Sequence, residues 1–156
     1  MRKCVGVVDT TFARVDMAKP VLRVFNEELP NYEIVRHTVP GIKDLPGAAK
    51  RLLDLGCEAV ITLGWVGAKE VDKLSYLAAS MGLIMVSILT GKIVIDVTVH
   101  EDEADDPSEL EKIALHRAEA HARNLALMLT RGPQALTRWA GMGRRQGYPD
   151  VGPLRP

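Results

Sequence analysis

The sequence predicts an α/β fold in three layers (α/β/α), with helices on both faces of a four-stranded parallel sheet. Short apolar runs, such as residues 4–8 and 59–63, alternate along the chain with longer segments of helical periodicity. Turns that contain glycine or proline follow these runs and end each strand at a defined point. Strands joined by helices need right-handed crossovers, so they are expected to form a parallel sheet.

The length and charge of the chain limit the number of domains and the classes of partner that it could bind. With 156 residues, it is expected to form a single domain over 1–156. The 20 Lys and Arg residues balance the 20 Asp and Glu residues, so no surface for nucleic acid or an anionic membrane is indicated. The first apolar run is too short for a signal peptide or a membrane span, which predicts a cytoplasmic protein. Cys4 and Cys57 lie in apolar surroundings and are expected to be packed, reduced thiols.

The first part of the chain contains two predicted strands with a helix between them. Residues 4–8 are typical of a strand buried on both faces, and a polar loop follows at 10–14. Apolar residues recur at helical spacing over 16–29, and 32–39 is rich in strand-forming residues. The second predicted strand leads into the turn that is the centre of the predicted site.

That turn combines a strand stop with a helix start. Pro40 cannot donate to a sheet and Gly41 can adopt positive φ, so the strand ends there. Asp44 is placed to cap a helix over 44–55, with its carboxylate accepting from the free amides of the first turn. Lys43 and the backbone of this turn then lie beyond the carboxyl end of the strand, where open α/β sheets bind ligands.

The middle of the chain predicts two further strands. A third strand at 59–63 ends in a Gly-Trp-Val-Gly turn. We expect a helix over 70–81 that Gly82 stops, and a fourth strand over 83–89. Residues 92–99 alternate like a strand but also fit one face of a short helix, and their β propensity favours the strand.

The last third predicts one long helix and a tail. Ser108 and Glu111 have the spacing of a capping box, and the helix that they open ends near 132–133. The tail, about 133–156, contains aromatic residues but little periodicity apart from a short helical piece at 136–140. We expect this tail to pack on a neighbouring subunit.

Three segments closely resemble the archaeal riboflavin synthases. They are VDTTFARVD at 8–16, TVPGIKDLP at 38–46 and LTRWAGMGRRQGY at 136–148. The resemblance extends over nearly the whole chain. That family is similar in turn to the lumazine synthases, whose Val-Pro-Gly turn with a following acid and proline recurs at 39–46.

The resemblance implies a flavodoxin-like, lumazine-synthase-like subunit that assembles as a homopentamer, with active sites between neighbouring subunits. It implies an enzyme, riboflavin synthase, which is a transferase of riboflavin biosynthesis. One molecule of 6,7-dimethyl-8-ribityllumazine would donate a four-carbon unit to a second, giving riboflavin and 5-amino-6-(D-ribitylamino)uracil. No redox cofactor is implied, and a divalent cation such as Mg²⁺ could assist.

One departure separates the chain from the lumazine synthases. By motif position, Lys73 replaces the histidine that moves protons in that family, and Lys-Glu-Val at 69–71 replaces the Gly-x-Thr that holds substrate phosphate. The arginine that completes the phosphate site falls in the acidic segment after His100. A phosphate dianion would be poorly tolerated there, which favours riboflavin synthase.

The implied reaction needs flat surfaces for two pteridine rings and donors for their carbonyl groups. Phe12 lies in a polar turn without an obvious core and is the first candidate for ring stacking. Trp65 is a second candidate, which could equally serve a subunit interface. The other candidate substrate-binding residues are Thr11, Val39, Pro40, Gly41, Ile42, Asp44 and Gly64.

The reaction also needs a base for the acidic C7 methyl proton of the lumazine. Lys43, Lys73 and His100 are the candidate catalytic residues, although an isolated lysine is usually a solvated surface charge. The carboxylates of Glu101, Asp102 and Glu103 could raise the pKa of His100 or hold a hydrated Mg²⁺, with Glu101 and Asp102 as the candidate metal ligands. The alternative is that these carboxylates form an acidic approach to the long helix.

Two rival functions stay open. The chain could be a lumazine synthase, which would need an anion site that the sequence does not show. It could also be a non-catalytic flavin- or lumazine-binding protein, which would bind its ligand tightly without turnover. Turnover of 6,7-dimethyl-8-ribityllumazine alone separates these functions from riboflavin synthase.

Overall fold

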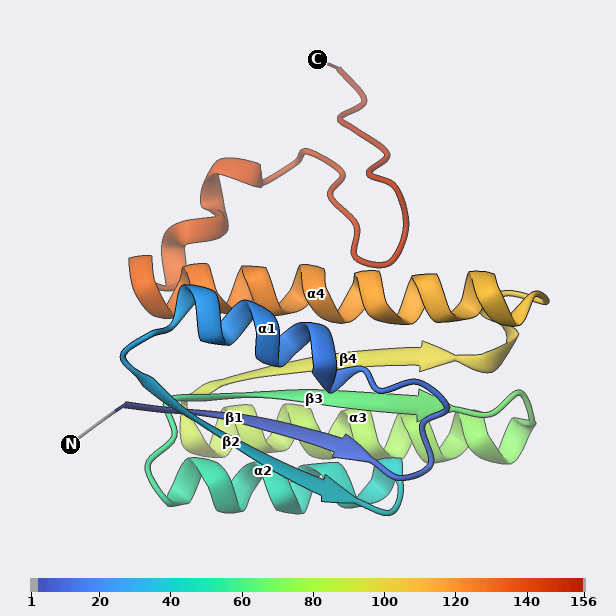
Figure 1. The fold of residues 1–156 in the computed structure, drawn as a ribbon, viewed down its shortest axis with the longest axis horizontal. Helices are drawn as coiled ribbons and strands as arrows, with labels where there is room; N and C mark the ends of the chain where they lie inside the picture. Colours follow the sequence, from blue (N-terminus) through green and yellow to red (C-terminus); the bar gives the residue numbers. More distant parts are fainter. Residues whose placement is uncertain (1–2, 156) are drawn as a thin grey trace.

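The computed structural model describes residues 3–155 and has three layers, with the four strands parallel in the order β2-β1-β3-β4 (Figure 1). This confirms the predicted fold class. The elements are β1 (Lys3–Thr10), α1 (Ala18–Glu28), β2 (Tyr32–Val39), the 3₁₀ turn η1 (Ile42–Asp44), α2 (Leu45–Asp54), β3 (Ala59–Val66), α3 (Glu70–Thr90), β4 (Ile93–His100), the 3₁₀ turn η2 (Glu101–Glu103), α4 (Pro107–Arg131) and the 3₁₀ helix η3 (Pro133–Trp139).

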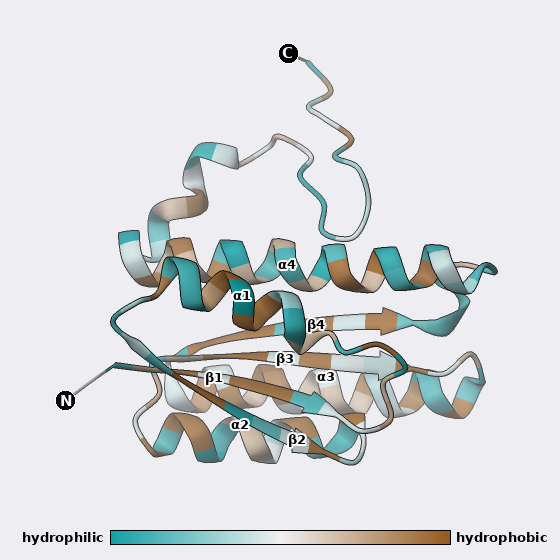
Figure 2. Ribbon diagram, in the orientation of Figure 1, coloured by the Kyte–Doolittle hydropathy of each residue, from teal (hydrophilic) through white to brown (hydrophobic). Residues whose placement is uncertain are grey.

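Two hydrophobic cores hold the layers together, one on each face of the sheet. Helices α1 and α4 cover one face, where Phe25, Leu63 and Leu125 are buried, and α2 and α3 cover the other, where Leu45 and Leu52 are buried (Figure 1). Hydropathy follows this arrangement, since the strands are largely hydrophobic and the outer turns of α1 and α4 are hydrophilic (Figure 2). All four strands point the same way, so their following loops meet at one edge.

The prediction of a fourth strand at 83–89 is wrong, because α3 continues without a break through these residues. Within this apolar run, Leu83 and Val86 are buried while Ile84 and Met85 are exposed, which is the pattern of one helix face. Gly82 does not stop the helix but packs it, since a Cβ there would lie 2.8 Å from Pro46 Cγ in α2. The fourth strand is instead β4, which confirms the preference for a strand at 92–99.

Two predicted helix caps differ from those in the structure. The capping box at Ser108 is wrong, because α4 begins earlier, at Pro107, and Asp106 accepts from the Ser108 N–H at 3.0 Å. Asp44 does precede α2, but its side chain does not cap that helix. Its carboxylate accepts from the Gly41 N–H at 3.0 Å and so closes the turn that precedes the helix.

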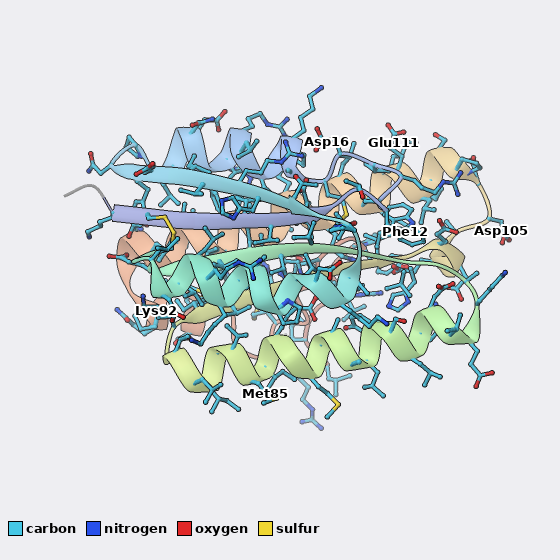
Figure 3. All side chains as sticks on the ribbon, turned by 90° about the horizontal axis from the view of Figure 1, so that it is seen from below. Phe12, Asp16, Met85, Lys92, Asp105 and Glu111 are labelled. Carbon is cyan, nitrogen blue, oxygen red and sulfur yellow. A yellow bond between two sulfur atoms is a disulfide. The ribbon has the colours of Figure 1, made fainter. Side chains whose placement is uncertain are left out.

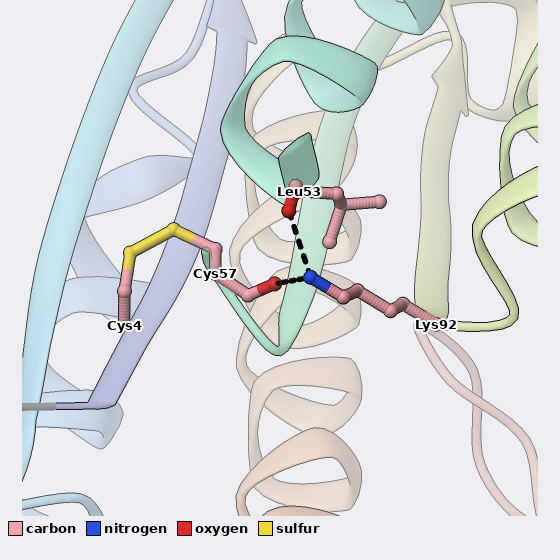
Figure 4. Close-up of a disulfide and its surroundings, with 4 residues drawn as sticks. All are labelled: Cys4, Leu53, Cys57 and Lys92. Carbon is pink, nitrogen blue, oxygen red and sulfur yellow. Dashed lines mark hydrogen bonds between the residues drawn. A yellow bond between two sulfur atoms is a disulfide. The ribbon is translucent and has the colours of Figure 1, made fainter. Parts of the chain in front are cut away.

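Cys4 and Cys57 form a disulfide, so the prediction of reduced thiols is wrong (Figure 4). The sheet topology brings them together: β3 pairs with β1, with Ala59 opposite Val5, and the residues before β3 therefore lie beside the start of β1. Lys92 adds a second link at this edge, since its ammonium donates to the carbonyls of Leu53 and Cys57 at 2.7 and 2.9 Å (Figure 4). An apolar setting alone did not reveal this proximity.

The outer face of α3 is apolar and uncovered. Its exposed side chains have fractional exposures between 55% and 73%, and they are Val71, Leu74, Leu77, Met81, Ile84, Met85, Ile88 and Leu89. Figure 3 shows Met85 on the side of α3 that faces away from the sheet. By length and composition α3 could also cross a membrane, but that evidence is weak, and the same stripe fits contact with other protein chains.

Candidate functional site

A hollow of about 230 Å³ lies at the carboxyl edge of the sheet. It is formed by the loops after β1, β2 and β3 together with the first turns of α3, and its lining residues are Phe12, Gly41, Ile42, Lys43, Asp44, Trp65, Val66, Gly67, Asp72 and Ser75. Figure 3 places Phe12 at this end of the molecule and Lys92 at the opposite end. The central turn and Phe12 therefore meet where the sequence predicted a ligand site.

Hydrogen bonds hold the Phe12 loop against the central turn. The N–H of Thr11 donates to the Val39 carbonyl at 2.9 Å, and its hydroxyl donates to the Pro40 carbonyl at 3.3 Å. Phe12 itself is 51% exposed, so its ring presents an open face at the hollow. These bonds fix the position of Phe12. The residues that make them, Thr11, Val39 and Pro40, do not themselves line the hollow.

The central turn exposes backbone to the hollow because its apolar side chain points inward. Ile42 is 9% exposed and packs on Gly64, where a Cβ would lie 2.9 Å from Ile42 Cδ1. The absence of a side chain at Gly64 therefore leaves the space in which Ile42 packs. Lys43 is exposed and lines the hollow, so its ammonium can reach a bound ligand.

Trp65 is buried and offers no open ring face. Its side chain is 1% exposed, and its indole N–H donates to Glu101 Oε1 at 2.9 Å. The indole forms the wall between the Phe12 hollow and a second hollow of about 280 Å³ beside α4. The stacking role predicted for Trp65 does not fit this burial, whereas a supporting role does.

Lys73, His100 and Asp102 form a compact cluster at the end of β4. Lys73 Nζ lies 2.9 Å from His100 Nδ1 and 2.8 Å from Asp102 Oδ1. Because an ammonium can only donate, Nδ1 accepts and the neutral imidazole carries its proton on Nε2. The Tyr76 ring packs edge-on against the imidazole at 5.1 Å.

The electrostatics of this cluster keep His100 neutral. Burial lowers the pKa of His100, and the positive charge of Lys73 lowers it further. The carboxylates of Glu103 and Asp102 do act to raise this pKa, as predicted, but burial and Lys73 outweigh them, so the predicted net rise is wrong. The hydrogen bond from Lys73 in turn holds the pKa of Asp102 below its usual value.

The acidic residues after β4 have hydrogen-bond or ion-pair partners within the chain. Glu101 accepts from Trp65 and lies 3.6 Å from Arg14, while Asp102 is paired with Lys73. Within residues 3–155, no group of three or more His, Cys, Asp and Glu side chains is placed to hold a metal ion. Both carboxylates are thus engaged by the protein itself, and the Mg²⁺ role predicted for Glu101 and Asp102 stays a prediction.

The candidate residues fall on two faces of α3. Asp72 and Ser75 face the Phe12 hollow, whereas Lys73 and Tyr76, each one position further along the helix, face His100. One position in a helix is a rotation of about 100°. A single chain therefore does not bring Phe12 and Lys43 into one pocket with the Lys73 cluster.

Comparisons with known proteins identify the family. The model of the 6,7-dimethyl-8-ribityllumazine synthase family matches residues 2–131. A riboflavin synthase of Aeropyrum pernix is 70% identical over 155 residues, which covers 99% of this chain and 100% of the relative. Riboflavin synthases of Archaeoglobus fulgidus and Methanothermobacter marburgensis are 51% and 50% identical, each over 96% of this chain and over 97% and 98% of the relative. The chain belongs to the archaeal riboflavin synthases of the lumazine synthase family.

The C-terminal tail of this member of the riboflavin synthase family lies outside the segment that matches the lumazine synthase family. The match ends at residue 131, whereas the Aeropyrum pernix relative is similar along 99% of the chain. In the structure, the tail after η3 loops down to the outer side of α4 and then turns away from it toward the C-terminus (Figure 1). The Gly147 N–H donates to His116 Nδ1 at 3.2 Å, so part of the tail packs on its own subunit.

Arg117 is a functional candidate that the sequence did not point to, and its partner Glu103 was expected only as one of the carboxylates beside His100. Arg117 is 9% exposed, and its guanidinium makes two hydrogen bonds of 2.8 Å to the Glu103 carboxylate. A signal was present, because Arg117 stands in the apolar stripe of α4, between Ile113 and Leu125. A charged residue on a buried helix face needs a partner, and the acidic segment after β4 supplies it.

Proposed function

We propose that this chain converts two molecules of 6,7-dimethyl-8-ribityllumazine into riboflavin and 5-amino-6-(D-ribitylamino)uracil. The observation that carries the proposal is the full-length identity of 70% to a riboflavin synthase. The site geometry supports it, since an exposed aromatic ring lies beside exposed backbone at the carboxyl edge of the sheet. Acidic residues after β4, where lumazine synthases complete a phosphate site, favour a substrate without phosphate.

Phe12 and the central turn would bind one substrate. The exposed ring of Phe12 gives a flat apolar surface for a pteridine, and the backbone of Gly41 and Lys43 offers hydrogen bonds to pyrimidine edges. The Lys43 ammonium would polarise a ring carbonyl. These contacts fix the plane and the direction of the ring, which is the main requirement for a reaction between two bound molecules.

The Lys73 cluster would move the C7 methyl proton. Loss of this proton leaves a carbanion that is conjugated into the lumazine ring, so a modest base is sufficient. If the shared proton moves from Lys73 Nζ to His100 Nδ1, the freed amine lone pair of Lys73 could take the C7 methyl proton, and the reverse shifts would return it. Asp102 keeps a negative charge beside the pair and so balances the ammonium.

We also propose a homopentamer whose active sites lie between neighbouring subunits. The Phe12 hollow of about 230 Å³ is smaller than a usual pocket for one drug-sized ligand, about 300–1,000 Å³, and the reaction needs two. A neighbouring chain would enlarge this hollow and supply catalytic groups from its own Lys73 cluster. The apolar outer face of α3 supports such an assembly.

Three further properties belong to the proposal. The chain would act in the cytoplasm, and the disulfide is compatible with this because intracellular proteins of hyperthermophilic archaea are often disulfide-rich. No redox cofactor would be needed, because the two products share the electrons of two identical substrates. Activity would persist without bound Mg²⁺, since Glu101 and Asp102 already have protein partners.

The test is incubation of the purified protein with 6,7-dimethyl-8-ribityllumazine alone, with Mg²⁺ or with EDTA. We expect riboflavin absorbance and fluorescence to appear with an equal amount of the pyrimidine product under both conditions. Ligand quenching without riboflavin would point to a binding protein. Formation of the lumazine from the pyrimidine and a phosphorylated four-carbon compound, without riboflavin, would point to lumazine synthase.

A further inference from the structure

The Glu103 carboxylate joins three separate parts of the chain. It accepts two hydrogen bonds from the Arg117 guanidinium of α4, both at 2.8 Å. It accepts one from the Tyr148 hydroxyl of the tail at 2.8 Å. Its Oε2 also accepts from the backbone N–H of His100 at 2.8 Å, at the last residue of β4.

These bonds place a permanent negative charge at this point. Burial by itself raises the pKa of Glu103, but the hydrogen bonds from Arg117, from the His100 N–H and from Tyr148 outweigh it and lower the pKa to about 2. Arg117 is also fixed, because it donates to the Thr98 carbonyl at 2.8 Å. Both partners of this ion pair are therefore held by neighbouring elements.

The contact with His100 links this ion pair to the candidate catalytic cluster. His100 and Asp102 both contact Lys73, and Glu103 bonds the backbone of the turn that carries them. We propose that Glu103 is a positioning residue for the riboflavin synthase reaction, which keeps His100 Nδ1 and Asp102 Oδ1 directed at Lys73 Nζ. This inference rests on the proposed function and adds a role for a residue that does not touch the substrate.

The tail completes the support of Glu103. Besides the Tyr148 hydroxyl, the Gln146 carbonyl accepts from Arg117 Nε at 3.1 Å. Between them, Gly147 has φ +90° and lies so close to the Arg117 guanidinium that a side chain would overlap it. The tail lies outside the segment that matches the lumazine synthase family but inside the segment that is similar to a riboflavin synthase. The contacts of Gln146 and Tyr148 therefore come from the part of the chain that is shared with riboflavin synthases.

The experiment compares Glu103→Ala with Glu103→Gln. Both variants remove the same charge beside Arg117, but only the glutamine keeps an oxygen that can accept from the His100 N–H. We expect kcat to fall about 100-fold in Glu103→Ala and about tenfold or less in Glu103→Gln, with KM changed less than about threefold in both. Glu109→Gln, which changes an exposed carboxylate at the start of α4, is the matched control with unchanged kcat.

A second measurement does not depend on turnover. Both variants lose the negative charge of Glu103, which raises the pKa of His100 in the native chain. In an NMR titration of the His100 imidazole, the pKa should therefore be higher in Glu103→Ala, where the ring leaves Lys73, than in Glu103→Gln, where it stays beside Lys73. Equal kcat and equal imidazole titration in the two variants would overturn the positioning role. A wild-type protein without riboflavin formation would overturn the proposed function, while the titration would still decide the role of Glu103.

Tyr148→Phe covers the case in which Glu103→Ala does not fold. This variant removes one hydrogen bond and leaves the Arg117 ion pair in place. We expect kcat to fall about threefold at unchanged KM, with the melting temperature kept within a few degrees. An unchanged kcat together with an unchanged imidazole titration would remove the tail from the positioning network.

Discussion

Phe12 gives the simplest single-residue test of substrate stacking. Its ring is 51% exposed in a loop that backbone hydrogen bonds fix in place, so Phe12→Ala should leave the fold intact. We expect the Kd for 6,7-dimethyl-8-ribityllumazine to rise about tenfold, because an aromatic pair contributes about 0.5–1.5 kcal/mol beyond its buried area. Fluorescence quenching measures the Kd. Leu55→Ala, which removes another exposed apolar side chain far from the site, should not change it.

Lys73→Met tests the proton-moving cluster. Removing the ammonium should lower kcat about 100-fold at nearly constant KM, because the variant still presents Phe12 and the central turn to the substrate. The pKa of His100 should rise, since the positive charge of Lys73 lowers it in the native chain. Lys50→Met, which breaks the exposed pair with Asp54, is the control. An unchanged kcat in Lys73→Met would exclude Lys73 from the chemistry.

For individual residues, the sequence predicted the positions of loops better than the directions of side chains. Phe12 and Lys43 were predicted at the site because strands that end in defined turns place those turns at one sheet edge. Trp65 was misjudged because β3 extends to Val66, which carries the indole into the core. The role of Glu103 depends on long-range contacts to α4 and the tail, which no local pattern shows.

Among the elements, α4 carries an acid-sensitive histidine. Burial, together with the nearby Arg117 and opposed by Asp96, lowers the pKa of His121 to about 4. The folded chain thus binds this proton less tightly than the unfolded chain does, so the free energy of unfolding falls as the pH drops below about 6.5 toward 4. Between pH 7.5 and pH 5 we expect a loss of about 1–2 kcal/mol, reduced by partial solvent exposure.

Urea unfolding at these two pH values measures this loss. His121→Gln should lose less stability than the native chain over the same interval, because it has no imidazole to protonate. His37 on β2 is exposed, and no change of this pH dependence is expected in His37→Gln. An equal pH dependence in His121→Gln and the native chain would assign the acid sensitivity to other groups.

Whether a segment is a helix or a strand could be predicted where the spacing of its apolar residues fits only one of the two. The bounds of β2 were predicted to the residue, because Asn31 and Pro40 punctuate both ends. Residues 83–89 were misread because an apolar run of this length fits a strand as well as a helix with one uncovered side. The wrong prediction of a strand arises from the uncovered face of α3, because this face carries apolar residues at positions that are usually polar in a surface helix.

For the molecule as a whole, the disulfide closes a long loop. Cys4 and Cys57 are separated by 53 residues, and closing such a loop stabilises a fold by about 4 kcal/mol through the entropy of the unfolded chain. We expect Cys4→Ser/Cys57→Ser to lower the midpoint of urea unfolding and leave kcat unchanged, because the bond lies at the edge opposite the site. Comparison with the native chain under reducing conditions is the control. A variant as stable as the native chain would mean that the bond adds nothing to stability.

The proposed homopentamer would explain both the apolar face of α3 and the separation of the two groups of candidate residues. The outer face of α3 exposes eight apolar side chains, and the two groups of candidate residues face different sides of the same helix. Ile84→Lys places a charge in this face without touching either group, so we expect a folded monomer by sedimentation and circular dichroism. Riboflavin formation should fall more than about 100-fold, because each site would lose the part that a neighbouring chain supplies. Leu55→Lys, the same kind of change at an exposed leucine just after α2, should keep both the proposed pentamer and its activity. A monomeric Ile84→Lys with full activity would show that one chain holds a complete site.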